Sequence, residues 1–127
     1  MTTVTWLDEP QHHDYPAAAS YLALIAEPDL VDHVVKKLRN SHNAAFFKAK
    51  DILRAAALAL LPADDPHVHS DLRKIHDHKD LSPILLVRGD LRAGIALQIA
   101  DGYHRVCASY HTDENTDIPC RIASITR

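Results

Sequence analysis

The sequence has no long apolar run, no excess of basic residues and only two cysteines. No apolar stretch approaches the roughly 20 residues that a membrane-spanning helix needs. The first 14 residues have neither the basic start nor the apolar segment of a signal peptide. Two cysteines do not make a disulfide framework. We therefore expect a reduced, cytoplasmic protein with no membrane partner.

The charge balance is slightly acidic, with 14 Lys and Arg against 17 Asp and Glu and a formal net charge of −3. Such a chain has no general attraction for nucleic acid, so DNA binding would need a local basic patch. The 127 residues are 46% hydrophobic and 24% charged, which is the composition of one globular domain.

The first part of the chain, residues 1–56, has the pattern of helices. Residues 15–26 are rich in alanine and begin beside a proline that suits a first helical turn. Pro28 opens a second predicted helix over residues 28–40, whose apolar residues fall on one face. Residues 41–56 predict a third helix, with Ser41 or Asn43 as its cap.

After residue 56 the pattern changes to short strands and helices. Residues 58–68 predict a brief strand and a loop, and residues 70–78 predict a helix capped by Ser70. All three glycines of the chain follow, so tight turns should concentrate there. The remaining elements are then predicted as a hairpin over 82–100, an amphipathic helix over 103–114, and a last strand over 116–125 in which Pro119 hints at a sheet edge.

This order of elements predicts a single α+β domain over residues 1–127. Residues 1–56 would form its helical N-terminal part, and residues 57–125 a core with a small mixed sheet. The helical half is expected to pack on or beside that sheet.

The stretch Asp101-Gly102-Tyr103-His104-Arg105 lies between a predicted strand and a predicted helix. The first turn of a helix attracts anions, because its N–H groups are unpaired and its end of the dipole is positive. Gly102 lets a ligand approach the backbone, while His104 and Arg105 can donate hydrogen bonds to a phosphate. The alternative is an ordinary turn that Asp101 caps and in which Arg105 is solvated.

Residues 57–125 resemble the core of the ParB/sulfiredoxin superfamily. Its members run in the order strand, proline-rich loop, helix, strand opening on Pro-Ile, and hairpin. A helix follows whose first residues carry a glycine and a His-Arg or Arg-Arg pair. In this chain Pro83-Ile84 opens an apolar run, and residues 102–108 read Gly-Tyr-His-Arg-Val-Cys-Ala.

The resemblance implies that this turn holds the phosphates of a nucleotide such as ATP, ADP or CTP. The phosphate-binding candidates are then Gly102, His104 and Arg105, with Tyr103 in the same turn, and Asp101 would hold a water bound to Mg²⁺. His67 stands on the proline-rich loop, where the superfamily often carries a polar residue facing the nucleotide.

Phosphoryl transfer or hydrolysis of a nucleoside triphosphate would also need a catalytic carboxylate. Asp64 or Asp65 on that loop could supply it. Lys79, just before the strand that opens on Pro-Ile, is a further candidate for a charge near the phosphates.

The chain differs from the superfamily pattern at two points, and each difference makes one function of the superfamily unexpected for this chain. Sulfiredoxin has its catalytic cysteine directly before the His-Arg pair, where this chain has Tyr103; Cys107 follows one turn later on the apolar face. Peroxiredoxin repair is therefore not expected. Partition proteins carry a helix-turn-helix domain after this core, whereas the chain stops at Arg127, so specific DNA partition is not expected either.

Two other interpretations belong to different classes. The first is a non-catalytic accessory module that binds a protein or, less favoured by the net charge, a DNA partner. The second is a domain in which the turn is purely structural. The ten histidines do not favour a metal site, because they have no cysteine partner and no His-Glu-x-x-His spacing.

Overall fold

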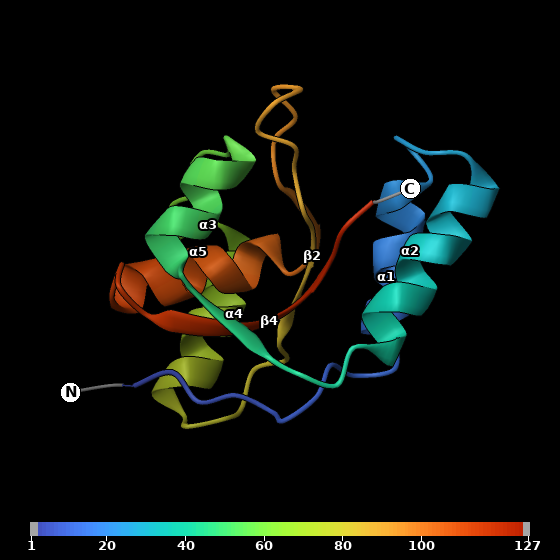
Figure 1. Cartoon of the computed structure of the whole chain (residues 1–127). Coiled ribbons are helices and arrows are strands. Elements are labelled where there is room, and N and C mark those ends of the chain that lie inside the picture. The colour runs from blue at the N-terminus through green and yellow to red at the C-terminus, as the bar shows by residue number, and fades with distance from the viewer. Residues whose placement is uncertain (1–2, 126–127) are drawn as a thin grey trace.

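The computed structural model describes residues 3–125 and has an α+β fold, as the sequence predicts (Figure 1). A mixed sheet lies between two layers of helices, one formed by α1 and α2 and the other by α3, α4 and α5. The elements are α1 (Asp14–Leu22), α2 (Pro28–Asn40), β1 (Ala45–Lys48), α3 (Ala49–Ala56), α4 (Pro66–His76), β2 (Ile84–Val87), β3 (Gln98–Asp101), α5 (Tyr103–Thr112) and β4 (Asp117–Ala123).

The four strands lie in the order β1-β4-β2-β3. β4 pairs antiparallel with β1 and parallel with β2, while β2 and β3 form an antiparallel pair. The prediction that Pro119 marks an edge strand is wrong, since β4 has a neighbour on each side. Pro119 is tolerated because it lies opposite Phe46 of β1, and pairing with β2 begins only at Cys120.

The alternation of side chains along the strands builds a core on each face of the sheet. Ile84 and Leu86 of β2 pack with α3, α4 and α5, whereas Leu85 and Val87 pack with α1 and α2. All four are buried, which explains why β2 reads as a continuous apolar run. None of the helices in residues 3–125 has the length and apolar character needed to cross a bilayer.

The α1 and α2 layer confirms the helices predicted before residue 40. In α2 the buried residues are Val31, Val34 and Leu38, at the spacing of one helical face, and Pro28 occupies the first turn. Lys37 Nζ donates a 2.8 Å hydrogen bond to the carbonyl of Ser124, which ties this layer to the end of β4.

The single helix predicted over residues 41–56 is wrong in its first half. Ala45–Lys48 form β1, and a helix begins only at Ala49. The strand forms because β4 supplies its hydrogen-bond partners, and its side chains alternate: Phe46 is 63% exposed while Phe47 packs against the core. Helical spacing does describe residues 49–56, where Ile52 and Leu53 are among the buried residues.

The brief strand predicted within residues 58–68 does not form, and α4 begins earlier than predicted. Its cap is Asp65, not Ser70: the Asp65 carboxylate accepts hydrogen bonds from the N–H groups of His67 and Val68 at 3.0 and 3.1 Å. Pro66 takes the first helical position, where its missing N–H costs nothing. The hairpin is confirmed, with β3 starting at Gln98.

If both helical layers belong to one folding unit, core substitutions on either face should shift the same unfolding transition. Leu38→Ala in α2 and Ile52→Ala in α3 remove fully buried side chains, so each should lower the free energy of unfolding by about 3 kcal/mol. Leu24→Ala, at a position 82% exposed, is the control and should change little. Urea denaturation followed by circular dichroism measures this, and two separate transitions would contradict a single domain.

Candidate functional site

A polar cavity of about 260 Å³ lies where α4 and α5 pack together beside the end of β3. Five of the seven predicted ligand-binding residues line it, together with three residues of α4 that were not predicted. The lining residues are His67, Ser70, Asp71, Lys74, Asp101, Gly102, His104 and Arg105.

The start of α5 lacks a side-chain cap within the described residues. Gly102 is the residue before the helix and has φ +113°, in the left-handed region that favours glycine. Among the described residues no side chain caps this end of α5, so its first N–H groups are not satisfied by a cap. The alternative interpretation, a turn capped by Asp101, is therefore wrong.

Arg105 makes hydrogen bonds within the protein and is not a solvated side chain. Its Nη2 donates to the Asp101 carboxylate at 2.8 Å and to the carbonyl of Pro83 at 3.2 Å, and its side chain is only 17% exposed. Its Nε is buried and has no acceptor within residues 3–125. Arg105 thus joins the start of β2 to the turn, and its positive charge stays at the wall of the cavity.

Two carboxylates also face the cavity, and both have raised pKa values. Burial raises the pKa of Asp101, an effect that Arg105 opposes and the neighbouring Asp14 carboxylate reinforces. Burial also raises the pKa of Asp71, whose side chain is 13% exposed, although Lys74 opposes this with its Nζ 3.9 Å away. Burial therefore disfavours the charged form of both carboxylates, although each has a cation beside it.

The two histidines of the cavity come from different helices. The ring of His67, in the first turn of α4, lies 4.7 Å from that of His104, in the first turn of α5. The structure thus brings His67 close to the predicted turn. Each imidazole can offer an N–H donor at the mouth of the uncapped helix.

The remaining sequence candidates lie outside the cavity. Asp65 is used as the cap of α4, where backbone hydrogen bonds lower its pKa, and Asp64 is exposed on the loop before it. Lys79 follows α4 and lines a neighbouring hollow. The Tyr103 hydroxyl donates to the carbonyl of Ala59 at 2.5 Å.

Cys107 is buried within the core of the α5 side, and this burial raises the pKa of its thiol. A protonated, enclosed thiol is a poor nucleophile.

The three residues that sequence reasoning missed share one face of α4. Ser70, Asp71 and Lys74 follow His67 at three, four and seven positions, which is the spacing of neighbours on a helix. This signal is present in the sequence, but placing the helix start at Ser70 separates His67 from it.

Asp71 and Asp101 are the cavity residues suited to a hard cation, because carboxylate oxygens are the ligands that Mg²⁺ prefers. Within residues 3–125 no group of three or more His, Cys, Asp or Glu side chains is placed to hold a metal ion. Mg²⁺ commonly binds through one or two carboxylates plus the phosphates of a substrate. The cavity fits that arrangement better than a site made by protein ligands alone.

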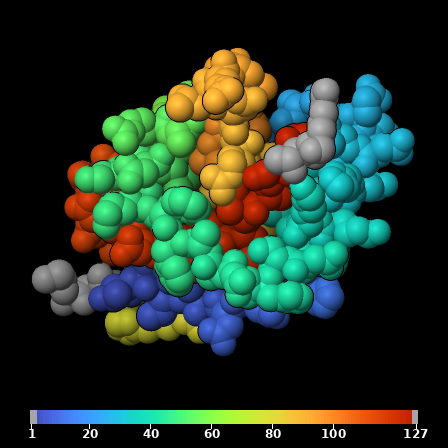
Figure 2. Space-filling view, in the orientation of Figure 1, coloured from blue at the N-terminus to red at the C-terminus, as the bar shows by residue number. Residues whose placement is uncertain are grey.

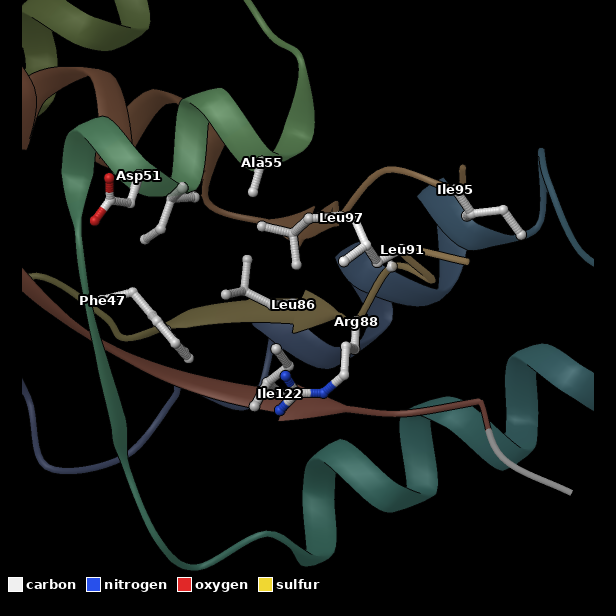
Figure 3. Close-up of a pocket in the computed structure, with 11 residues that line it drawn as sticks. Phe47, Asp51, Ala55, Leu86, Arg88, Leu91, Ile95, Leu97 and Ile122 are labelled. Carbon is white, nitrogen blue, oxygen red and sulfur yellow. The ribbon is translucent and has the colours of Figure 1, made fainter. Parts of the chain in front are cut away.

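A second hollow, of about 380 Å³ and largely apolar, lies between α3, the sheet and the β2–β3 turn (Figure 3). Leu86 of β2 and Leu97 of the hairpin extend into it, with Ile122 of β4 on its floor. Asp51 and Arg88 are its charged lining residues. Leu91, at the turn that projects from the surface, is 99% exposed (Figure 2).

Comparison with known protein families, characterised proteins and solved structures finds no match to this chain. The resemblance of residues 57–125 to the ParB/sulfiredoxin superfamily therefore stays a prediction from a short motif and the order of elements.

Gly102 should be more sensitive to substitution than Gly94, although both have positive φ. A Cβ at Gly102 would collide with Ile84 and lie 3.0 Å from Arg105 Nη2, whereas a Cβ at Gly94 meets nothing within 4 Å. We expect Gly102→Ala to lower the free energy of unfolding by about 3 kcal/mol and Gly94→Ala by about 1 kcal/mol. Urea denaturation provides both values, and equal losses would contradict the close packing of this turn.

The raised pKa of Asp71 predicts a pH-dependent stability difference. Protonation between the usual pKa of 3.8 and the raised pKa favours the folded state, so wild-type stability falls as pH rises through that window. Asp71→Asn removes this fall and should be more stable than wild type at neutral pH, with the difference vanishing below pH 3.8. Thermal unfolding across pH measures the effect. Asp64→Asn, exposed on the loop, is the control and should match wild type at neutral pH.

Proposed function

We propose that this chain binds a nucleotide, such as ATP, ADP or CTP, or another phosphorylated ligand in the cavity between α4 and α5. The observation that carries the proposal is the uncapped start of α5 opening into a cavity lined by His67, His104 and Lys74. Backbone N–H groups at a helix start, two imidazoles and an ammonium group are suited to phosphate oxygens. Arg105 adds its charge from the cavity wall.

The two carboxylates of the cavity make Mg²⁺ part of this proposal. A polyphosphate entering beside Asp71 and Asp101 would meet like charge, and burial already disfavours their ionised forms. Mg²⁺ bound through one of these carboxylates and the phosphates would neutralise that charge. Nucleotide binding should therefore be stronger with Mg²⁺ than without it.

Phosphoryl transfer to a hydroxyl acceptor, or to water in hydrolysis, is the chemistry that such a site can perform. A carboxylate on the cavity wall can accept the proton of the attacking hydroxyl while its oxygen bonds to the γ-phosphorus and the bond from that phosphorus to the leaving nucleoside diphosphate breaks. Asp71 suits this role better than Asp64 or Asp65, because it faces the cavity and is not used as a helix cap. Asp101 is already paired with Arg105.

The second candidate is a non-catalytic accessory module, and the apolar hollow of Figure 3 favours it. Exposed Leu91 and Ile95, which also line the hollow, form an apolar rim on the projecting turn. Contiguous apolar surface of this kind suits a protein partner. A DNA partner is less suited, given the formal net charge of −3.

Isothermal titration with ATP, ADP and CTP, each with and without Mg²⁺, tests the proposed site. Wild type should bind at least one nucleotide in a Mg²⁺-dependent manner, and ligand at 100 times Kd should add about 2.7 kcal/mol to its stability. His104→Ala should bind about tenfold more weakly, because it loses a donor at the phosphates. His76→Ala, an exposed histidine at the end of α4 that lines neither neighbouring hollow, is the matched control.

Failure of wild type to bind any of these nucleotides would overturn the proposal, and so would equal binding by His104→Ala and wild type. If binding is found, release of inorganic phosphate, measured on wild type and Asp71→Asn, separates a binding module from a hydrolase. A partner protein that perturbs the amide resonances of Leu91 and Ile95, without any nucleotide binding, would favour the accessory module.

A further inference from the structure

A third pocket lies on the opposite side of the sheet and has no part in the proposed nucleotide site. Its volume is about 210 Å³, and it is formed where α1, the end of α2 and β4 meet the segment before α1. Arg121 and Ala123 alternate with Ile122 along β4, so Arg121 faces the α1 and α2 layer together with the buried Ala123. The chemistry of this pocket is dominated by Arg39 and Arg121.

Arg121 is held inside the protein and has no ionic partner among residues 3–125. The residue is only 2% exposed, and its Nη2 donates to the carbonyl of Asp8 at 3.1 Å. Its Nη1 is buried and has no acceptor, and no carboxylate lies within ion-pair distance of it, among residues 3–125. Burial of a charge is costly unless it is paired, so a bound anion would relieve an existing penalty.

Arg39 brings a second positive charge to the same place. Its guanidinium lies over the ring of Tyr15, with Cζ 4.5 Å from the ring centroid. Arg121 and Arg39 both act on the phenol of Tyr15: they oppose the rise in its pKa that burial causes. Arg39, Arg121 and Tyr15 line the same pocket, and Arg39 is in contact with the phenol ring.

The other polar groups of the pocket complete an anion-binding set. Ser41 supplies a hydroxyl, His42 an imidazole and Tyr15 a phenol, all of which can donate hydrogen bonds. Glu9 is the one carboxylate that lines the pocket within the described residues. Two guanidinium groups against one carboxylate leave an excess of positive charge.

We propose that this pocket binds a small phosphate-type dianion, either inorganic phosphate or the phosphate group of a small monoester. Guanidinium groups bind phosphate oxygens through paired hydrogen bonds, and the planar fork of arginine suits this better than lysine. The pocket, of about 210 Å³, has room for a small anion of this kind. The proposal is independent of the nucleotide site, and it needs no Mg²⁺ because cations already predominate.

Titration of the full chain with inorganic phosphate, without Mg²⁺ and at constant ionic strength, tests this site by calorimetry and amide NMR. Saturable binding should shift the resonances of Tyr15, Ser41 and Arg121. Arg39→Gln, at an exposed position, should weaken binding about tenfold or more. Arg54→Gln is the matched control: this arginine is exposed on α3 and pairs only with Asp51, so phosphate binding should not change.

Arg121→Met provides a second readout that a purely structural arginine would not give. Because the buried charge has no ionic partner, its replacement should leave stability without phosphate unchanged or higher while abolishing stabilisation by phosphate. A marked loss of stability in phosphate-free buffer would instead assign Arg121 a structural role and count against the site.

Absence of saturable phosphate binding by wild type would overturn the proposal, as would equal affinity of Arg39→Gln and wild type. Shifts confined to residues 102–105 would place the phosphate in the cavity of α4 and α5 and also reject this site. A small monoester that binds more tightly than inorganic phosphate, with the same dependence on Arg39, would support it and identify the larger ligand class.

Discussion

The pairing of β4 with both β1 and β2 is the constraint on which the rest of the structure depends. These strands come from positions 45–48, 84–87 and 117–123, so the sheet closes only when distant parts of the chain meet. Cys120 is opposite Ala45 on one side and Ile84 on the other. Because side chains of β4 alternate between the two faces, this strand contributes to both cores, and each helical layer is anchored through it.

The same alternation explains why the two proposed ligand sites are separate. The hairpin partner β3 ends at Asp101, and the chain turns at once into α5, so the start of that helix meets α4 on one side of the sheet. Arg121 of β4 faces the other side, toward α1 and the end of α2. Basic groups therefore lie on each face of the sheet, those of one site on α4 and α5 and Arg121 of the other on β4.

The spacing of apolar residues along the sequence predicted those helices and strands whose formation does not depend on a distant partner strand. The stripe of α5, with Val106 and Cys107 buried, and the apolar run of β2 follow directly from periodicity. β1 did not, because residues 45–48 have helix-compatible spacing and become a strand only when β4 supplies their partners. The site was predicted in the same uneven way: the turn at 101–105 was recognisable, but Asp71 and Lys74 depend on where α4 begins.

Arg105 and Arg121 show why the partners of a charge carry more functional information than its burial. Both guanidinium groups are mostly enclosed, yet Arg105 has the Asp101 carboxylate at 2.8 Å, whereas Arg121 has a backbone carbonyl and no carboxylate within residues 3–125. A paired arginine is accounted for by the fold itself, because its partner compensates the buried charge. An unpaired one keeps a penalty that the fold does not remove. The same reasoning applies, with opposite sign, to Asp71, whose burial disfavours its charge beside a single ammonium group 3.9 Å away. An anion bound beside Arg121 would reduce the free-energy cost of burying that charge. A phosphate that carries Mg²⁺, bound beside Asp71, would do the same for the buried carboxylate.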